Sequence, residues 1–234
     1  INGEGDLLPG IVCDVYDQVG VLQFDGENPK EFWQAKWVAE AILQNTDLKS
    51  IYLKPRRNED FSAITFGEKL DSTKTIVKEN GMQFFVDIEH GQKTGFFLDQ
   101  RNNRHFIASL AKDKSVLNLF SYTGGFSIYA GVAGATKVVS VDIAKKALDQ
   151  AEESWLANQL KPENHISIVS DVLKYKVDSN ELYDIVVSDP PSMAHSSKNK
   201  EVAIKKYVEA FVVAARLVKS GGFLALSSCS SHID

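Results

Sequence analysis

Two residues near the end of the chain could carry out chemistry, an aspartate and a cysteine that each follow an apolar run. Asp189 follows the run 183–188 and precedes two prolines, while Cys229 follows the run 223–227 inside a serine-rich segment. A thiolate is a nucleophile, and a carboxyl group can form a hydrogen bond to a reacting group. The prolines fix the backbone and would hold Asp189 rigidly. A lone cysteine is more often a small buried apolar residue, but the polar neighbours of Cys229 favour a functional role.

Three further segments place glycine or acidic residues directly after apolar runs. The segment 118–125 ends in two glycines, and Asp142 and Asp171 each follow a run rich in valine or isoleucine. Glycine lets the backbone approach a ligand closely, but neither the GxGxxG pattern nor the P-loop pattern of phosphate sites is present. The amino-acid end of S-adenosylmethionine therefore fits segment 118–125 better than a dinucleotide does. Asp142 would then accept hydrogen bonds from ribose hydroxyls, and Asp171 would lie near the adenine.

Each of these three segments also has a plainer interpretation. The glycines of 118–125 could form a tight packing turn, Asp142 could cap the following helix, and Asp171 could cap a helix or turn. Taken singly, the signals are weak. Their order along the chain, each directly after an apolar run, is what favours a cofactor site.

The elements that would position these residues alternate between strands and helices from about residue 100 onward. The expected strands are 116–119, 137–141, 166–169, 183–188 and 223–227, and the expected helices are 101–112, 126–134, 144–159 and 200–218. This alternation indicates a parallel, doubly wound α/β sheet, in which ligands bind outside the carboxyl ends of the strands. Residues 1–90 lack that rhythm and predict a smaller α/β unit, with a helix over 32–43 and a hairpin turn at Asn80-Gly81.

The composition is that of an ordinary globular protein. The 234 residues are 44% hydrophobic and 24% charged, with a net charge of −5 and two distant cysteines, of which Cys13 is expected in the core. No apolar run approaches the roughly 20 residues of a membrane span, so a cytoplasmic protein is expected. The histidines are too scattered to predict a metal site. Basic clusters at Lys54, Arg56 and Arg57 and at 198–206 are expected to be solvated surface, with an RNA groove as the alternative.

Longer segments of the sequence resemble one family of enzymes. These segments are 2–10, 91–101, 117–125, 189–192 and 228–230. Together they resemble the RlmI-like family, class I S-adenosylmethionine-dependent methyltransferases typified by bacterial enzymes that make 5-methylcytosine in large-subunit ribosomal RNA. The resemblance covers nearly the whole chain and is most specific in 91–101, which reads GQKTGFFLDQR.

The resemblance implies a domain layout and a partner. Residues 1–90 correspond to the family's small central α/β domain, and residues 91–234 to its Rossmann-like catalytic domain. The family's N-terminal RNA-binding PUA domain and its last two strands have no counterpart here, so the catalytic domain is expected to be incomplete at its C-terminal end. The implied partner is large-subunit ribosomal RNA, and the family often forms homodimers.

The resemblance also assigns roles to individual residues. It makes Cys229 the nucleophile that adds to carbon 6 of cytosine, and Asp189 the group that orients the base. The residues implied to line or rim the cofactor pocket are Gln100, Arg101, Phe120, Tyr122, Thr123, Gly124, Asp142 and Asp171. Some RNA 5-methylcytosine enzymes carry a second cysteine directly after the two prolines, whereas this chain has Ser192, which leaves the base for the last step unassigned.

Three other functions remain open on the sequence. The first is methyl transfer to another RNA atom, such as a guanine ring nitrogen, which would make Cys229 dispensable. The second is methylation of a small molecule or a protein side chain, which would not require RNA. The third is a cofactor-binding RNA assembly factor that does not catalyse transfer.

Overall fold

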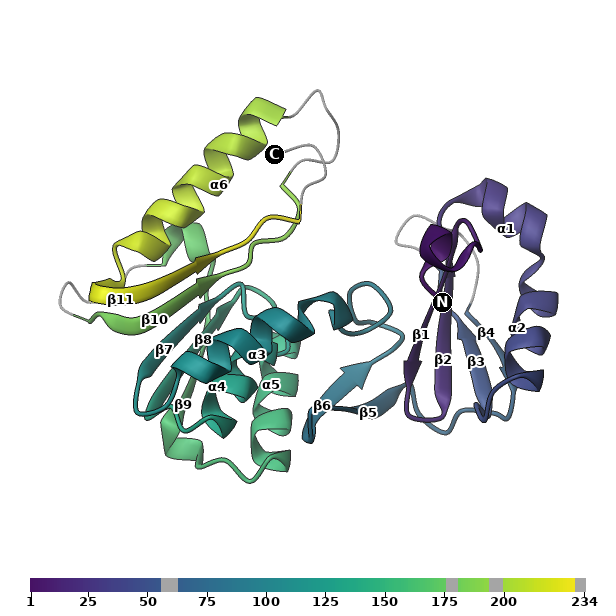
Figure 1. The fold of residues 1–234 in the computed structure, drawn as a ribbon, viewed down its shortest axis with the longest axis horizontal. Helices are drawn as coiled ribbons and strands as arrows, with labels where there is room; N and C mark the ends of the chain where they lie inside the picture. Colours follow the sequence, from purple (N-terminus) through teal and green to yellow (C-terminus); the bar gives the residue numbers. More distant parts are fainter. Residues whose placement is uncertain (56–62, 176–180, 194–199, 230–234) are drawn as a thin grey trace. The chain divides into compact units, whose positions relative to one another are not determined.

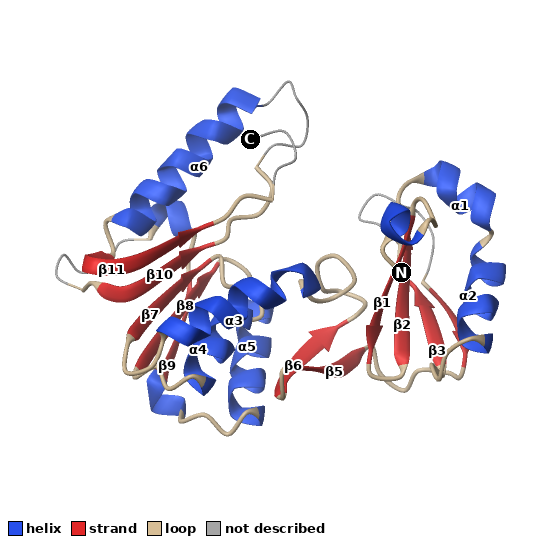
Figure 2. Cartoon of the chain, in the orientation of Figure 1, coloured by secondary structure: helices blue, strands red, loops and turns tan. Residues whose placement is uncertain are grey.

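The computed structural model describes residues 1–55, 63–175, 181–193 and 200–229 (Figure 1). The chain divides into two compact units, one formed by residues 1–79 and 85–98 and the other by residues 80–84 and 99–234. Helices and strands occur in both units (Figure 2). No helix among the described residues is both long enough and apolar enough to cross a membrane.

The first unit is built on a four-stranded sheet with the order β1-β2-β3-β4. The strands are β1 (Ile11–Tyr16), β2 (Val19–Phe24), β3 (Ser50–Leu53) and β4 (Ile64–Gly67). A short 3-10 helix, η1 (Gly3–Asp6), precedes them, and α1 (Glu27–Trp33) and α2 (Ala35–Gln44) connect β2 to β3. The single helix expected over 32–43 is wrong, because Gln34 has a φ of 52° and separates two helices. Cys13 is buried in the core of this unit, as expected, and burial raises the pKa of its thiol to about 11.

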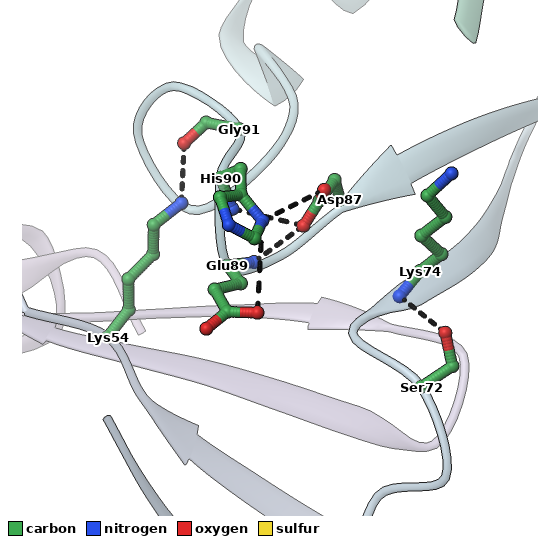
Figure 3. A network of polar contacts seen from close by, with 7 residues as sticks. All are labelled: Lys54, Ser72, Lys74, Asp87, Glu89, His90 and Gly91. Atoms are coloured by element: carbon green, nitrogen blue, oxygen red, sulfur yellow. Dashed lines mark hydrogen bonds and ion pairs between the residues drawn. The ribbon is translucent and has the colours of Figure 1, made fainter. Parts of the chain in front are cut away.

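The specific segment 91–101 begins as a loop fastened to the first unit. Thr94 donates to Asp14 at 2.5 Å and lies 2.8 Å from the hydroxyl of buried Tyr16. Lys54 reaches the loop from the end of β3 and donates to the carbonyl of Gly91 at 2.5 Å (Figure 3). Lys54 is only 7% exposed, and burial lowers the pKa of its ammonium group to about 8. The expectation that Lys54 is a solvated surface charge is therefore wrong, because its buried ammonium group binds the loop at Gly91 to the end of β3.

A two-stranded ribbon carries the chain from the first unit into the second. It consists of β5 (Lys74–Glu79) and β6 (Met82–Asp87), joined at Asn80 and Gly81 with φ values of 50° and 81°. Two consecutive residues with positive φ are what a two-residue hairpin turn requires, so the turn predicted at Asn80-Gly81 is confirmed.

The second unit contains a five-stranded parallel sheet with the order β11-β10-β7-β8-β9. Its strands are β7 (Ser115–Leu119), β8 (Lys137–Asp142), β9 (His165–Val169), β10 (Tyr183–Ser188) and β11 (Val218–Leu226). The chain runs outward from β7 through β8 to β9 and then returns to the other side of β7 for β10 and β11. This order confirms the expected doubly wound sheet, with a switch point between β7 and β10.

Helices cover both faces of this sheet. The helices are η2 (Leu98–Gln100), α3 (Arg101–Leu110), α4 (Gly125–Val132), α5 (Lys145–Ala157), η3 (Pro162–Asn164), η4 (Val172–Lys174) and α6 (Lys200–Ala215). Helices α4 and α5 pack on one face, and α3 packs on α4. On the opposite face, Ala214 and Leu217 join Leu117, Val139 and Val186 in one buried apolar cluster. The last strand begins at Val218, earlier than the expected residue 223, with an irregularity in its pairing before Phe223.

Candidate active site

The predicted site residues, apart from Gln100 and Arg101, lie at or directly after the carboxyl ends of the five strands of the parallel sheet. Leu119 at the end of β7 pairs with Val141 of β8 on one side and with Ser188 at the end of β10 on the other. The loops that leave β7 and β10 therefore start side by side at the switch point, where doubly wound sheets bind ligands. Because β11 pairs with β10 in parallel, its end adds Ser227 and Cys229 to the same edge.

The loop after β7 has an unusual backbone. Phe120, Tyr122 and Gly124 have φ values of 57°, 48° and 76°, so two non-glycine residues adopt the left-handed conformation. Such residues cost free energy and persist only where their surroundings hold them. Here the amide of Ser121 donates to the carbonyl of Val141 at 3.1 Å, and the amide of Gly124 donates to the carbonyl of Ser121 at 2.9 Å. The loop is thus a fixed turn before ligand arrives.

Asp142 connects this loop to the next strand. Its Oδ2 accepts a hydrogen bond from the amide of Tyr122 at 2.8 Å, and its Oδ1 accepts one from the amide of Ala144 at 2.8 Å. The structure therefore gives Asp142 a role in shaping the turn as well as a place at the rim. Each carboxylate oxygen has a second lone pair, so the capacity to accept a ribose hydroxyl remains.

Gly124 and Asp171 show the plainer roles that the sequence left open. A Cβ at Gly124 would lie 2.7 Å from the Cβ of Ala151 on α5, so packing alone requires glycine there. Asp171 accepts a hydrogen bond from the amide of Leu173 at 3.0 Å and caps η4. Neither contact prevents a part in ligand binding, and for both residues the cofactor role stays a prediction.

The structure brings the two candidate catalytic residues together. Cys229 Sγ lies 3.7 Å from the carbonyl oxygen of Pro190, the residue directly after Asp189. Ser227 Oγ donates to Asp189 Oδ1 at 2.5 Å, which joins β11 to the end of β10 through side chains. The proximity predicted from neighbouring strands is thus observed, and the Cys229 side chain is exposed.

Two residues that the sequence analysis did not single out support this arrangement. Ser227 was missed, although pairing of two parallel strands in register would have placed it beside Asp189. Tyr207 was missed because it lies on the buried stripe of α6, which reads as core. Its hydroxyl donates to the carbonyl of Pro191 at 3.3 Å and lies 3.4 Å from the amide of Met193, so α6 holds the segment after the two prolines.

Gln100 is the last residue of η2, and Arg101 is the first residue of α3. Gln100 Oε1 accepts a hydrogen bond from Asn103 at 2.7 Å, and Arg101 is exposed. Among the described contacts, none joins Gln100 or Arg101 to the loop after β7, so their place at the rim stays a prediction. Arg56, Arg57, His195 and Lys198 lie outside the described residues, whereas Lys200, Lys205 and Lys206 are exposed on α6, as expected for solvated surface. Within the described ranges, no group of histidine, cysteine and acidic side chains is arranged to hold a metal ion.

A family model described as S-adenosylmethionine-dependent methyltransferase matches residues 37–231. The chain belongs to this family of methyltransferases. The enzyme class and cofactor predicted from the sequence are thereby confirmed at the level of the family.

The relatives of this methyltransferase chain agree with the RlmI-like resemblance. A ribosomal RNA large subunit methyltransferase of Deinococcus radiodurans is 34% identical over 246 residues, which cover 100% of this chain and 60% of the relative. The ribosomal RNA large subunit methyltransferase I of Shewanella amazonensis is 35% identical, with 98% of this chain and 60% of the relative covered. The chain thus spans about 60% of the length of these relatives.

Solved structures share the architecture. A protein from Streptococcus mutans described as an S-adenosylmethionine-dependent methyltransferase superposes with a TM-score of 0.79 at 29% identity, covering 96% of this chain and 58% of that protein. A second methyltransferase with the same TM-score and identity was solved in complex with SAH. The tRNA m1G37 methyltransferase of Methanocaldococcus jannaschii, at 23% identity and a TM-score of 0.67, shares the fold.

Unpartnered hydroxyl groups at the switch point fit a polar cofactor. Ser121 and Thr123 lie in the loop after β7, and Ser188 ends β10. All three are buried, and among the described residues none of their hydroxyl oxygens has a hydrogen-bond partner. Buried polar groups are nearly always satisfied, so their clustering at one edge of the sheet is typical of a site completed by ligand. The amino-acid end of S-adenosylmethionine carries an ammonium and a carboxylate group that could use them.

Proposed function

We propose that this chain is the catalytic part of an enzyme that methylates carbon 5 of a cytosine in large-subunit ribosomal RNA through a covalent adduct on Cys229. The observation that carries the proposal is the position of the Cys229 thiol, 3.7 Å from the carbonyl of Pro190 and next to Asp189 at the switch-point edge. The names of the relatives support ribosomal RNA as substrate, and family membership supports S-adenosylmethionine as methyl donor.

The cofactor would lie across the ends of β7, β8 and β9. Ser121 and Thr123 would bond to its amino-acid end, and the loop residues Phe120 and Tyr122 would form the wall around it. Asp142 would accept the ribose hydroxyls on the lone pairs that its two backbone contacts leave free. When bound, the cofactor supplies an electrophilic methyl group on a positively charged sulfur.

The target base would lie between this cofactor and the end of β11. Carbon 5 of cytosine is a poor nucleophile, so the ring must first be activated. The Cys229 thiolate adds to carbon 6, and the electrons of the 5,6 double bond move onto carbon 5. A hydrogen bond donated by the protonated carboxyl of Asp189 to the ring would stabilise the negative charge that develops on addition, and Ser227 holds that carboxyl in place.

The covalent adduct between Cys229 and the base must then accept the methyl group and release the enzyme. Carbon 5 takes the methyl group, and its hydrogen leaves as a proton to a base. The electrons of that carbon–hydrogen bond restore the double bond and expel Cys229 as a thiolate. Ser192 stands where some related enzymes carry a second cysteine, so water or hydroxide in the pocket is the simplest proton acceptor in this chain.

The decisive experiment uses the full-length protein with unmodified large-subunit ribosomal RNA and labelled S-adenosylmethionine. The RNA is digested to nucleosides, and the methylated product is identified by mass spectrometry. We expect 5-methylcytidine from the wild type and none from Cys229→Ala, while Cys13→Ala should retain the activity because Cys13 is buried in the apolar core of the other unit. RNA containing 5-fluorocytidine should form a denaturation-resistant adduct, since fluorine at carbon 5 cannot leave as a proton.

Other products would change the function assigned to this chain. A methylated guanosine, made equally well by Cys229→Ala, would remove the nucleophile and favour direct transfer to a ring nitrogen. Methylation in the absence of RNA would favour a small-molecule or protein substrate. Binding of S-adenosylhomocysteine with no transfer to any RNA would favour an assembly factor.

A further inference from the structure

A line of polar side chains crosses the otherwise apolar interface between the parallel sheet and helices α4 and α5. Asn118 Nδ2 on β7 donates to Ser127 Oγ on α4 at 2.9 Å, and Ser127 Oγ lies 2.7 Å from Ser140 Oγ on β8. Ser140 Oγ lies 2.8 Å from Nε2 of His165 on β9. Asn118, Ser127 and Ser140 are each no more than 1% exposed. Apolar residues would fill this space at lower cost, so the chain of hydrogen bonds calls for an explanation.

The outer end of the line is an imidazole beside a carboxylate. His165 Nδ1 lies 3.2 Å from Glu152 Oε1, and Ser167 Oγ donates to the same carboxylate oxygen at 2.5 Å. The imidazole stacks on Trp155 at 4.5 Å between ring centroids. Glu152 is the charged group that faces His165 among the described residues. Burial lowers the pKa of His165, which Glu152 opposes, so the ring is neutral at neutral pH.

The hydrogen bonds of this line are all made when they run from Asn118 toward His165. Ser127, which accepts from Asn118, then uses its single proton toward Ser140, and Ser140 uses its proton toward His165 Nε2; in the reverse direction the Ser127 proton would have no acceptor within the line. Nε2 is then the unprotonated nitrogen and the ring proton sits on Nδ1, which makes no hydrogen bond among the described residues but lies 3.2 Å from the Glu152 carboxylate. The orientation of the Asn118 amide, at the other end of the line, follows from the same hydrogen bonds. Its NH₂ group must face Ser127, because the Ser127 proton is used toward Ser140. The amide oxygen, which is buried and has no hydrogen-bond partner in the part of the chain that the structure describes, faces away from the line.

We propose that His165 is a positioning residue for the cofactor site, which acts through Ser140 and Ser127 to hold the Asn118 amide in one orientation. Asn118 lies two residues before Phe120, at the base of the loop that begins the site. The line keeps a hydrogen-bond acceptor at this base. Protonation of His165 Nε2 would turn the Ser140 proton toward Ser127, and the Ser127 proton would then find an acceptor in the line only if the amide flipped, which would replace that acceptor with a donor.

The link to the cofactor rests on the proposed function, whereas the direction of the line does not. The first measurement is therefore the tautomer of His165 in the full-length protein at pH 7.5, from the nitrogen chemical shifts of the imidazole. We expect a proton on Nδ1 and none on Nε2. A proton on Nε2 would overturn the proposal whether or not the protein binds a cofactor.

The second measurement is the affinity for S-adenosylhomocysteine by calorimetry. Ser140→Ala interrupts the line and frees the amide to flip, so the Kd should rise by about five- to tenfold, the effect of one lost hydrogen bond. Asn118→Leu removes the acceptor and should weaken binding at least as much. Because both changes act through the same amide oxygen, the double variant should bind no worse than Asn118→Leu alone.

A matched control separates positioning from packing. Ser167→Ala removes a hydroxyl on β9 that contacts Glu152 but lies outside the line between His165 and Asn118, so its Kd should equal that of the wild type. Additive losses in the double variant would show that Ser140 and Asn118 act independently and would overturn the proposal. If the wild type bound no S-adenosylhomocysteine, the proposed cofactor site would fail, while the tautomer would still test the line itself.

Discussion

The candidate site has a cofactor half, at the ends of β7, β8 and β9, and a catalytic half, formed by Asp189 after β10 and Cys229 after β11. The two halves are held in place in different ways. On the cofactor half, backbone and carboxylate hydrogen bonds fix the loop after β7, through Val141 and Asp142, and β7 itself pairs with β10 on one side and β8 on the other. On the catalytic half, Cys229 follows the edge strand β11, where Phe223 is 52% and Leu224 36% exposed. The side-chain bond from Ser227 to Asp189 and the backbone bond from the Ser227 amide to the Ser188 carbonyl at 3.1 Å join the end of β11 to that of β10.

This difference in how the two halves are held corresponds to what cofactor binding and methyl transfer each require. A turn with left-handed residues at Phe120 and Tyr122 must be held before ligand arrives, since strain left unsupported would relax. The nucleophile needs only the right position relative to a base that RNA delivers. Variants on the cofactor half should therefore change affinity and stability, and variants on the catalytic half should change the rate.

The largest effect is expected from Asp142→Ala. The change removes the acceptor for the amides of Tyr122 and Ala144 and the proposed acceptor for ribose. Two charge-assisted hydrogen bonds are lost, so the Kd for S-adenosylhomocysteine should rise on the order of 50-fold by calorimetry. The matched control is Asp149→Ala, an exposed aspartate on α5 paired with Lys145, which should bind normally. Unchanged affinity in Asp142→Ala would mean that the turn keeps its shape without the carboxylate.

Gly124→Ala should lower the free energy of unfolding by about 2 kcal/mol, because it forces a left-handed conformation on a non-glycine residue and a close contact. The new Cβ would lie 2.7 Å from the Cβ of Ala151. Adding Ala151→Gly removes the contact but not the backbone strain. Urea denaturation of the single and double variants should show partial rescue. Full rescue would mean that the positive φ costs nothing, and no rescue would mean that the contact is relieved elsewhere.

The positions of these residues could be predicted from the sequence because they depend on periodicity. Strand ends place Asp142, Asp171, Asp189 and Cys229 at one edge of a parallel sheet, whichever side chains fill the core. What the residues do there could not be predicted, because it depends on local geometry. The bond from Tyr122 to Asp142 requires a φ of 48° at Tyr122, which nothing in the residue types demands.

Burial of charge was the other feature that the pattern did not reveal. Lys54 stands beside Arg56 and Arg57 in the sequence and was expected to share a solvated surface. Its place at the end of β3 directs its ammonium group to the Gly91 carbonyl, a contact between segments 37 residues apart. The line from Asn118 to His165 was missed for the same reason, since it depends on which elements become neighbours in space.

On the catalytic half, Ser227→Ala should lower kcat about tenfold and leave the Kd for S-adenosylhomocysteine unchanged. The change frees the Asp189 carboxyl, which then spends less time oriented toward the base, and one hydrogen bond corresponds to about that factor. Ser220→Ala, at an exposed position in the irregular part of β11, is the matched control. A loss of cofactor affinity in Ser227→Ala would show that the two halves are not separate.

The smallest effect should come from a contact that joins the halves at the opposite edge of the sheet. Asp184 on β10 accepts hydrogen bonds from the amide and hydroxyl of Ser115 on β7, at 2.8 and 2.7 Å, and from Lys219 on β11 at 3.0 Å. The Ser115 contacts, followed by Lys219, hold the pKa of the Asp184 carboxyl well below its ordinary value. Its stabilising contribution is therefore complete above the unfolded-state pKa of about 4 and is lost as the pH falls below it.

Asp184→Asn should accordingly cost about 1 kcal/mol of unfolding free energy at pH 7, a modest figure because the carboxyl is partly solvated. The difference between wild type and variant should shrink between about pH 4 and pH 2, because protonation of the wild-type aspartate removes the same charge. Denaturant melts across this range measure it, and the lowered pKa of Glu181 beside Lys137 is common to both proteins and cancels. Cofactor affinity and kcat should stay at their wild-type values, because the contact lies at the amino ends of the strands. A pH-independent difference would show that Asp184 acts through shape rather than charge.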